Sequence, residues 1–590
     1  MAWYDEAVFY HIYPLGMLDA PKENTYGDPV HRLPGLIPWI GHLRQIGVNA
    51  LYIGPLFESV GHGYETTDYK KLDSRLGDNG DLKTFVAKCH EAGIRVILDG
   101  VFNHTGRDFF AFQDIKKNRE NSPYKDWYCN VNFWGNNEYN DGFSYENWGG
   151  YNLLVKLNQR NPAVRDYICD VIRFWVSEFD IDGIRLDAAD VLDFDFMKVL
   201  RHVANEVKPQ FWLMGEVIHG DYTRWVNEGT LHSVTNYHLH KALYSGHNDH
   251  NYFEIAHTVK RLYGMGGNRP DGLKLYNFVD NHDVERIYTK LNNKAHFAPV
   301  HVLLYTLPAV PSIYYGSEFG IEGKKEKFSD ASLRPALRYE DYANAVKDNP
   351  CTRLIAALGR VRQQAKALSY GDYRELVLTN TQYAFSRSTG DETVLVTVNN
   401  DDNNASLTLP ACGNSAYVGA LSGVQVTANG DNITVNLPGG FGEIWLPVRD
   451  GVMPAVDGAA AAQAEVTSAD DTAPDNEAKS VDAMVTADAG TMAAGATIDA
   501  DAGQISSAET EDRSIAAETT PDSPSAPLQP AAAPAQEALD EAFEKGKIAG
   551  LQEAILAIMS KNGPITDQMR RDVTDNVYHD SLINWIKSFR

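Results

Sequence analysis

Over the first 365 residues, short apolar runs rich in β-branched and aromatic residues alternate with longer amphipathic stretches. The short runs predict eight strands, at 7–14, 50–57, 95–102, 183–188, 211–217, 233–239, 275–281 and 312–318. Between them, as at 81–93 and 161–179, apolar residues recur at three- and four-residue steps, which indicates helices. Eight strand-helix repeats predict a closed (β/α)8 barrel over residues 1–365, in the α/β class.

The connection after the third predicted strand is too long for a simple crossover. Residues 103–155 are rich in Asn, Gly, Trp and Tyr, and this aromatic content is too high for a solvated tail. We therefore expect a small inserted subdomain here. Its aromatic residues could form sugar platforms, but for most of them core packing is the better prediction. They include Trp127, Trp134, Tyr145 and Trp148.

The pattern changes to period two over residues 366–448, which predicts an antiparallel β-sandwich domain. Residues 449–535 consist mainly of Ala, Asp, Thr, Ser and Pro, and this composition predicts a disordered acidic linker. Apolar residues return at helical spacing over 536–590, which predicts a helical module. That module is either a self-packing cap or a surface for self-association or a protein partner.

The formal net charge of −26 is concentrated in the predicted linker, because residues 450–535 hold 16 Asp or Glu against 2 Lys or Arg. No basic groove is evident, so neither nucleic acid nor an anionic membrane is an expected partner. Charged residues interrupt the amino terminus where a signal peptide needs an apolar core, and no run approaches the ~20 apolar residues of a membrane span. The five cysteines lack metal-type spacing, which favours reduced thiols and a cytoplasmic location.

Polar residues follow several predicted strands at the end where a barrel gathers its active site. They are Asp99, Asn103 and His104 after the third strand, Arg185 and Asp187 at the fourth, Glu216 at the fifth, and His282 and Asp283 at the seventh. Taken singly, an Asp after a strand is usually a helix cap or a turn former. Together, we expect these side chains to converge on one cavity.

Three carboxylates buried at one mouth would repel one another unless a cation or a shared proton offset the charge. Arg185 lies two residues before Asp187, hence on the same strand face, and is the expected counter-ion. Acids accompanied by histidines and aromatics suit glycoside hydrolysis, in which one carboxylate attacks the anomeric carbon and a second, protonated, donates to the leaving oxygen. A retaining enzyme needs these two groups about 5–5.5 Å apart.

Four segments, in this order, resemble the signature regions of the α-amylase family of glycoside hydrolases. They are DGVFNH (99–104), GIRLDAAD (183–190), GEVIH (215–219) and FVDNHD (278–283). Two further matches are GYETTDY (63–69) and PSIYYGSEFG (311–320), and the resemblance covers residues 3–448.

The resemblance implies a role for each matching residue. Asp187 would be the nucleophile, Glu216 the general acid and then base, and Asp283 the stabiliser of the oxocarbenium-like transition state. The implied sugar-binding residues are Tyr64, Asp99, His104, Arg185, His282 and Arg334, with Tyr64 stacking on the ring and Asp99 ordering the site by holding Arg185.

Lys156, Leu157 and Asn158 resemble the MPKLN region of neopullulanases and cyclomaltodextrinases, which implies short or cyclic maltodextrins as substrates, α-1,6 branches included. Two features depart from those enzymes. Ile218 stands where they commonly carry Trp, and the barrel begins almost at residue 3, without their extra amino-terminal β domain.

The sequence matches the calcium-binding residues of classical α-amylases only in part. Classical α-amylases bind calcium through an Asn equivalent to Asn103 and carry a Lys-His pair where this chain has Ala189 and Asp190. The segment LDAPKENTYGDP also lacks the regular acidic spacing of a calcium loop. The sequence favours no required metal and no cofactor, with calcium as the alternative.

The function expected is a retaining α-glucan hydrolase that cleaves α-1,4 and, as a further class, α-1,6 glucosidic bonds of maltooligosaccharides or cyclodextrins through a covalent intermediate. One alternative is a 4-α-glucanotransferase, which passes the same intermediate to a sugar. Another is a catalytically silent carbohydrate-binding or scaffold barrel, although such relatives usually lose one of the acids.

Overall fold

A computed structural model of the chain describes residues 2–266, 273–327, 329–390, 392–449 and residue 454. The predicted acidic linker beyond residue 454 and the helical module 536–590 lie outside the described residues. No helix in the described part of the chain is long and apolar enough to cross a membrane.

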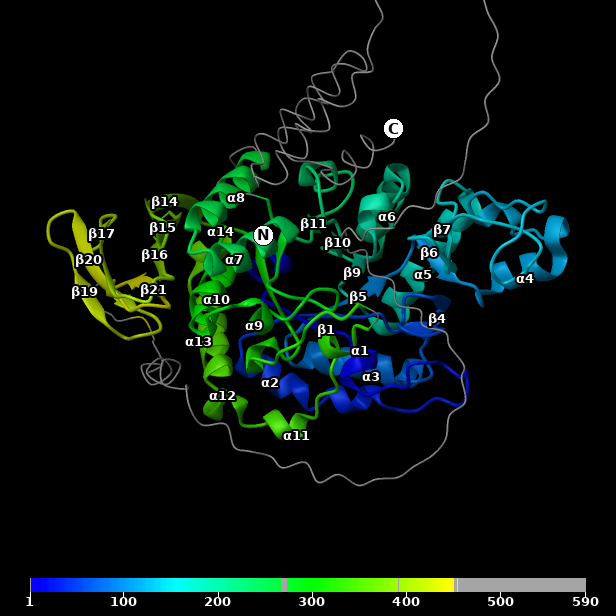
Figure 1. Ribbon diagram of the computed structural model, residues 1–590, viewed down its shortest axis with the longest axis horizontal. Helices are drawn as coiled ribbons and strands as arrows, with labels where there is room; N and C mark the ends of the chain where they lie inside the picture. The colour runs from blue at the N-terminus through cyan, green and yellow to red at the C-terminus, as the bar shows by residue number, and fades with distance from the viewer. Residues whose placement is uncertain (1, 267–272, 328, 391, 450–453, 455–590) are drawn as a thin grey trace, which may run out of the picture. The chain divides into compact units, whose positions relative to one another are not determined.

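Eight parallel strands form the central sheet, in the order β11-β10-β9-β5-β2-β1-β13-β12. They are β1 (Phe9–Ile12), β2 (Ala50–Ile53), β5 (Arg95–Gly100), β9 (Gly183–Leu186), β10 (Trp212–Gly215), β11 (Ser233–Val234), β12 (Tyr276–Asn277) and β13 (Val310–Tyr314). Figure 1 shows this sheet at the centre of the barrel, with β1, β5, β9, β10 and β11 labelled. A parallel bridge between Thr235 and Tyr276 joins the two ends of the sheet. The predicted (β/α)8 barrel is therefore confirmed.

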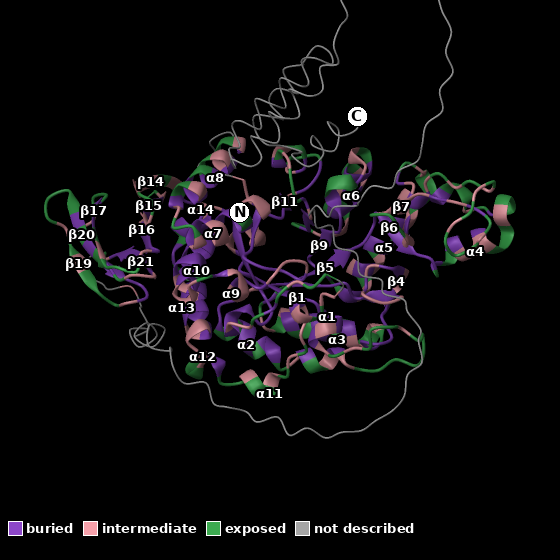
Figure 2. Cartoon of the chain, in the orientation of Figure 1, coloured by how far each residue is buried: buried purple, intermediate pink, exposed green. Residues whose placement is uncertain are grey.

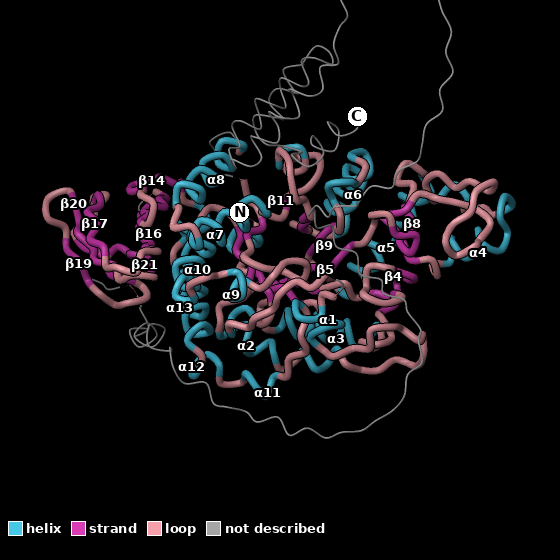
Figure 3. Tube along the Cα trace, viewed as in Figure 1, coloured by secondary structure: helices cyan, strands magenta, loops and turns pink. Residues whose placement is uncertain are grey.

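Helices surround these strands (Figure 3). The longer ones are α2 (Trp39–Gln45), α3 (Asn79–Glu91), α5 (Pro162–Phe179), α6 (Phe194–Val207), α7 (Tyr237–Asn248), α8 (Tyr252–Met265), α10 (Phe297–Thr306) and α13 (Pro350–Gln364). In α5, the Asn161 side chain accepts a hydrogen bond from the Ala163 N–H, Pro162 occupies the first position, and Asp180 ends the helix in the left-handed region. Both helices expected at 81–93 and 161–179 are present.

Several predicted strands are too long. The run 233–239 is a strand at 233–234 alone, because Asn236 caps α7 through a hydrogen bond from the Leu239 N–H and the chain is helical from Tyr237. The run 275–281 is a strand at 276–277, and 312–318 ends its strand at residue 314. Loops at the barrel mouth are buried too, so an apolar run continues past the last paired residue.

Residues between β5 and α5 form the predicted insertion. Its antiparallel sheet contains β6 (His104–Gly106), β7 (Asn147–Trp148) and β8 (Tyr151–Lys156), and the insertion also includes α4 (Phe110–Asn118). Trp127 and Tyr145 are buried, as core packing requires, and Trp148 is half-buried. Trp134 differs, because its side chain is 97% exposed.

A hairpin that the sequence did not predict lies between β2 and α3. It consists of β3 (Phe57–Ser59) and β4 (Thr66–Leu72), and its turn carries Tyr64. The connection after the second barrel strand therefore also contributes to the mouth of the barrel.

The region after α13 forms antiparallel sheets, as predicted. Six strands pair in the order β14-β15-β16-β21-β18-β19, and β17 pairs with β20. Their bounds are β14 (Asp372–Leu378), β15 (Gln382–Thr389), β16 (Glu392–Asn399), β17 (Ala405–Pro410), β18 (Ala416–Gly419), β19 (Gln425–Thr427), β20 (Asn432–Leu437) and β21 (Phe441–Pro447). Leu395 and Trp445 of the larger sheet share one core with Leu409 and Val435 of the pair.

The strands of the barrel are buried (Figure 2), and the side chains at their two ends differ in kind. At the amino ends of the strands the interior is aromatic, with Phe9 stacked on Trp212 at 5.0 Å and Trp3 packed against both. These rings fill the lower part of the barrel, as side-chain layers do in this fold. Polar groups are therefore left to the carboxyl ends of the strands.

Candidate functional site

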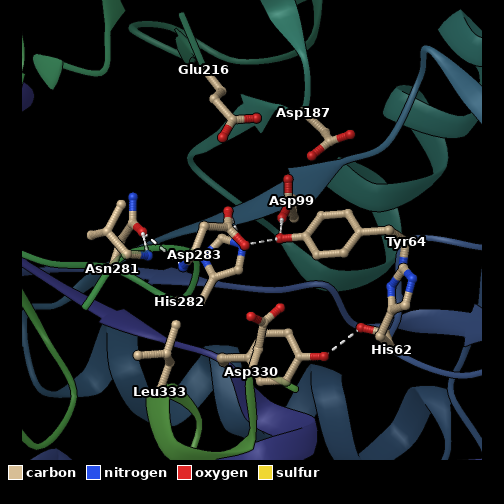
Figure 4. Close-up of polar contacts among 12 residues, drawn as sticks. His62, Tyr64, Asp99, Asp187, Glu216, Asn281, His282, Asp283, Asp330 and Leu333 are labelled. Carbon is tan, nitrogen blue, oxygen red and sulfur yellow. Dashed lines mark hydrogen bonds and ion pairs between the residues drawn. The ribbon is translucent and has the colours of Figure 1, made fainter. Parts of the chain in front are cut away.

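Polar side chains that are far apart in the sequence meet at the carboxyl ends of four strands. Asp99 lies near the end of β5, Asp187 follows β9 directly and Glu216 follows β10 directly. Asp283 comes from the loop after β12. The carboxylates of Asp187, Glu216 and Asp283 face one space (Figure 4), so the structure brings the three predicted acids together.

Arg185, in β9, lies at the centre of this group. Its Nη1 is 2.8 Å from Asp99 Oδ1 and 2.9 Å from Asp187 Oδ1, and its Nη2 is 2.8 Å from Glu216 Oε2. Arg185 is buried, with 3% of its side chain exposed. The arginine expected to neutralise Asp187 therefore holds three carboxylates.

Charge balance around Arg185 favours a retained proton. Burial raises the pKa of Asp187, an effect that Arg185 opposes and that the charge of Glu216 reinforces. Burial also raises the pKa of Glu216, again against Arg185, while the charge of Asp283 adds to the rise. Since one guanidinium cannot offset three ionised carboxylates, the site is built to keep a proton on this pair.

Asp283 has its own cationic partner. Arg334 Nη2 is 3.1 Å from Asp283 Oδ1, and the Asp283 N–H donates to Asn281 Oδ1 at 2.8 Å. Its side chain is 33% exposed, against 11% for Asp187 and 15% for Glu216. Of the three acids, Asp283 is the one most open to solvent.

The protonation of His282 follows from its neighbours. The Tyr64 hydroxyl donates to Asp99 Oδ2 at 3.1 Å, so it must accept from His282 Nε2, which lies 2.5 Å away. The same Nε2 is 3.0 Å from Asp283 Oδ2. Burial lowers the pKa of His282 well below its ordinary value. His282 is therefore a neutral ring with its proton on Nε2, facing the acids.

Tyr64 also connects the site to His104. His104 Nε2 donates to the Tyr64 carbonyl at 3.1 Å, while its Nδ1 accepts from Asn103 Nδ2 at 3.2 Å. Burial lowers the pKa of His104 to about 3, so this ring is neutral as well. All nine predicted site residues thus lie at the barrel mouth. Asp99, Asp187 and Glu216 contact Arg185, His282 and Arg334 contact Asp283, and His104 contacts Tyr64.

Several residues at the mouth were not predicted from the sequence. Tyr52 donates to Asp99 Oδ2 at 2.9 Å, and His11 stacks on Tyr52 with ring centroids 4.1 Å apart. His11 and Tyr52 are register partners in β1 and β2. This pairing is a property of the folded sheet, so neither residue had a signal in the sequence. Tyr237 and Asn281 were also missed.

Metal ligands do not gather at this mouth in the described part of the chain. The one group of three His, Cys, Asp or Glu side chains with ligand atoms within 4.8 Å of one another there is His31, Asp78 and Asp81. Asp78 and Asp81 cap α3, and His31 contacts Asp81. A site without a required metal stays a prediction.

A polar cavity of about 620 Å³ lies beside the insertion rather than at the acids. The segment Lys156–Asn158, whose resemblance implied a maltodextrin preference, lines it together with Glu146 and Val191. Lys156 forms an ion pair with Glu146. This segment therefore shapes the surface next to the loop after β9, and none of the three acids lines this cavity.

An eight-stranded barrel with acids from its strand ends on one buried arginine is the arrangement expected of a glycoside hydrolase. The family described as the α-amylase catalytic domain matches residues 12–360, more than half of the chain, and the maltogenic amylase C-terminal domain matches residues 373–442. The chain belongs to the α-amylase family of glycoside hydrolases, as its four short segments suggested.

Within this family, the chain is similar to enzymes named cyclomaltodextrinase and neopullulanase. The chain is 32% identical over 427 residues to a cyclomaltodextrinase from Bacillus sp, covering 68% of this chain and 74% of that one. It is 30% identical over 457 residues to neopullulanase 2 from Thermoactinomyces vulgaris, covering 72% and 74%. A solved cyclomaltodextrinase structure matches with a TM-score of 0.67 and 28% identity over 75% of this chain and 78% of that one.

Proposed function

We propose that this protein is a retaining α-glucan hydrolase that cleaves α-1,4 bonds of maltooligosaccharides and cyclodextrins, with α-1,6 branch points as a further class of substrate. The observation that carries the proposal is the contact of one guanidinium, that of Arg185, with both Asp187 and Glu216. A retaining mechanism needs a nucleophile and an acid close together. A guanidinium that contacts both Asp187 and Glu216 keeps these two carboxyl groups near each other.

In the first step, the Asp187 carboxylate attacks the anomeric carbon while the glycosidic C–O bond breaks. Glu216 gives its proton to the departing oxygen, which leaves as a sugar hydroxyl, and the glucosyl unit becomes an ester of Asp187. In the second step, Glu216 takes a proton from water, whose oxygen attacks the same carbon and releases Asp187. Both steps pass through positive charge on the sugar ring.

Asp283 supports that positive charge in this proposal. Its carboxylate is held by Arg334 and His282 Nε2, so it can face the ring without reorganising during the reaction. In this proposal, the ring hydroxyls and the ring face are bound by the side chains around the acids. These are Tyr64, Asp99, His104, Arg185 and His282. No step requires a metal or another cofactor.

The substrate class is supported by the names of the relatives, which are cyclomaltodextrinase, neopullulanase and intracellular maltogenic amylase. A 4-α-glucanotransferase remains the second candidate, because the same ester of Asp187 can pass to a sugar hydroxyl. A silent barrel is the third, and the presence of all three acids counts against it.

A product profile tests the proposal. The full-length protein is incubated with maltotriose, β-cyclodextrin, pullulan and soluble starch, and products are followed over time. Shorter sugars released with retained α configuration are expected. Products longer than maltotriose would instead indicate the glucanotransferase, and no conversion of any of the four substrates would contradict catalysis of glucan cleavage.

We further propose a cytoplasmic location and self-association or partner binding through residues 536–590. The cysteines Cys89, Cys129, Cys169, Cys351 and Cys412 are all free, and a relative is named as intracellular. Apolar residues such as Leu551 and Ile555 recur at helical spacing in the terminal segment. Removing residues after 454 should leave hydrolysis unchanged and, if the segment self-associates, lower the mass in solution beyond that of the deleted segment; an unchanged oligomeric state would contradict self-association.

A further inference from the structure

Tyr237 lies at the acid site without a role in the mechanism above. It is the first residue of α7, after β11, and its ring packs edge-to-face on Phe278 at 4.9 Å. The ring contact fixes the direction of its hydroxyl, which lies 3.5 Å from Glu216 Oε1. Catalytic hydrogen bonds are commonly long before substrate binds and tighten in the complex.

Asn281 decides which way the Tyr237 proton points. Asn281 Oδ1 accepts from the N–H groups of Asp283 and Val284, at 2.8 and 3.2 Å. The amide group must therefore turn its Nδ2 toward Tyr237, where it donates to the hydroxyl oxygen at 3.1 Å. Because that oxygen accepts from Asn281, the hydroxyl proton is free to be donated to Glu216 Oε1.

The other oxygen of Glu216 is already occupied. Oε2 accepts from Arg185 Nη2 at 2.8 Å and from the Ala188 N–H at 3.1 Å. Two strong donors on Oε2 leave Oε1 as the oxygen that carries the catalytic proton. Oε1 is the atom that Tyr237 faces.

We propose that Tyr237 is a positioning residue for Glu216, oriented by Asn281, which holds Oε1 toward the leaving oxygen and stabilises the carboxylate after it has lost its proton. The inference rests on the proposed function and deepens it. Through Asn281, which also binds the Asp283 backbone, the same hydrogen bonds link the acid to the loop that carries Asp283.

A Tyr237→Phe substitution removes none of the charged groups that face Glu216. They are Arg185 from β9, Asp187 and Asp190 from the segment after β9, and Asp283 from the loop after β12. A change in the ionisation of Glu216 in a Tyr237→Phe variant would therefore report the lost hydrogen bond. A donor to the charged form lowers the pKa of a carboxyl group, so its loss raises that pKa.

The test compares wild type, Tyr237→Phe and a control, Tyr370→Phe, on two substrates. Tyr370 also donates to a glutamate, Glu6 Oε1 at 3.0 Å, in the segment before β1 and therefore away from the acids. Maltotriose needs a proton on its leaving group, whereas α-maltosyl fluoride needs little help from an acid. The pH dependence of kcat/KM is measured for each.

For Tyr237→Phe, we expect the alkaline limb on maltotriose to move to higher pH by roughly 0.5–1 unit, the equivalent of one ordinary hydrogen bond. We expect kcat on maltotriose to fall about tenfold and that on α-maltosyl fluoride less than about twofold. The control should match wild type on both substrates.

An unmoved alkaline limb together with equal losses on both substrates would overturn the proposal. Asn281→Asp provides a second test, because it keeps the acceptor for the Asp283 N–H and replaces the donor to Tyr237 by an acceptor. The Tyr237 proton would then turn away from Glu216, and the same dependence on leaving group is expected. If wild type cleaves neither substrate, the proposed function itself fails.

Discussion

Arg185 Nη2 lies 2.8 Å from Glu216 Oε2, and Nη1 of the same guanidinium contacts Asp187. The expected nucleophile and the expected acid therefore share one buried cation, and Asp99 is its third partner. An ion pair in the middle of a buried strand is costly on its own. Here it sets the spacing and the protonation of two reacting groups, and the predictions below follow from it.

Replacing Arg185 by Met should leave Asp99, Asp187 and Glu216 buried without a counter-ion. We expect the free energy of unfolding to fall by about 3–5 kcal/mol, the usual effect of breaking a buried pair. Urea unfolding at pH 7 measures it. Arg160→Met is the matched control, since the Arg160 side chain is 84% exposed at its ion pair with Asp193 and the substitution should leave the urea midpoint close to that of wild type. Equal losses in the two variants would contradict the structural role of Arg185.

Replacing Asp187 by Asn should remove the nucleophile and leave the fold intact, because Arg185 keeps Asp99 and Glu216 as partners. Hydrolysis of maltotriose should fall at least about a thousandfold, with an unchanged circular dichroism spectrum. Asp170→Asn, which alters an exposed carboxylate paired with Lys70, should leave the rate unchanged. A variant of Asp187 with near wild-type turnover would remove the mechanism.

The pH dependence of hydrolysis should be bell-shaped. Burial raises the pKa of Glu216, so its acid form persists above the ordinary value of 4.5, and the rate falls as pH rises through the raised value. On the acid side, the rate falls as the Asp187–Glu216 pair gains a second proton. Steady-state kcat/KM against pH measures both limbs. A rate that keeps rising into the alkaline range would show that no protonated group is needed.

Buried neutral histidines should make the protein acid-labile. Burial lowers the pKa of His104, His232, His238, His240 and His247 to about 3, from an ordinary 6.5. Their contribution to stability is present above pH 6.5 and is lost as pH falls toward 3, because only the unfolded chain binds the protons. Each can cost up to about 1.4 kcal/mol per pH unit.

Urea midpoints at pH 7, 6, 5 and 4 measure this loss. Raised pKa values of Asp187 and Glu216 act in the opposite direction, since their contribution is largest at low pH and is lost as pH rises. His240→Phe should make the midpoint less dependent on pH than in wild type. A midpoint that is equal at pH 7 and pH 5 would contradict the assignment of neutral buried rings.

Two tryptophans of the insertion should respond differently to truncation. Trp127→Ala should lower the free energy of unfolding by about 3–5 kcal/mol, because Trp127 packs against Phe110, Tyr124 and Tyr167. Trp134→Ala should change it by less than about 0.5 kcal/mol, because its side chain is 97% exposed. Thermal unfolding of both variants measures the contrast, and similar losses would contradict the burial described.

Periodicity alone predicted the barrel, because its strands are apolar on both faces and alternate with amphipathic helices. It could not place strand ends. The run 233–239 reads as one apolar segment, yet Asn236 caps a helix there and turns Tyr237 toward Glu216. A cap is a local polar signal that a count of apolar residues does not register.

The acids could be predicted because a carboxylate just after a buried strand is conspicuous. Tyr52 and His11 could not be, since an aromatic ring inside an apolar strand looks like core until its partner is known. Tyr64 was found by resemblance alone, as the hairpin that carries it lies in a connection with no strand predicted. Residues that act through tertiary partners are the ones that a linear pattern misses.

The barrel closes between β11 and β12, where few backbone hydrogen bonds hold the two strands together. β11 and β12 are two residues long and meet through the bridge of Thr235 with Tyr276, where Asn236 Nδ2 also donates to Asn277 Oδ1 at 2.8 Å. Tyr237 follows β11 and the loop that carries Asp283 follows β12, so both begin where the barrel closes. The hydrogen bond between these two amide side chains adds to the few backbone hydrogen bonds that join β11 to β12. Asn277→Ala would therefore make the positions of Tyr237 and Asp283 less fixed, although Asn277 is not one of the residues expected to bind the sugar.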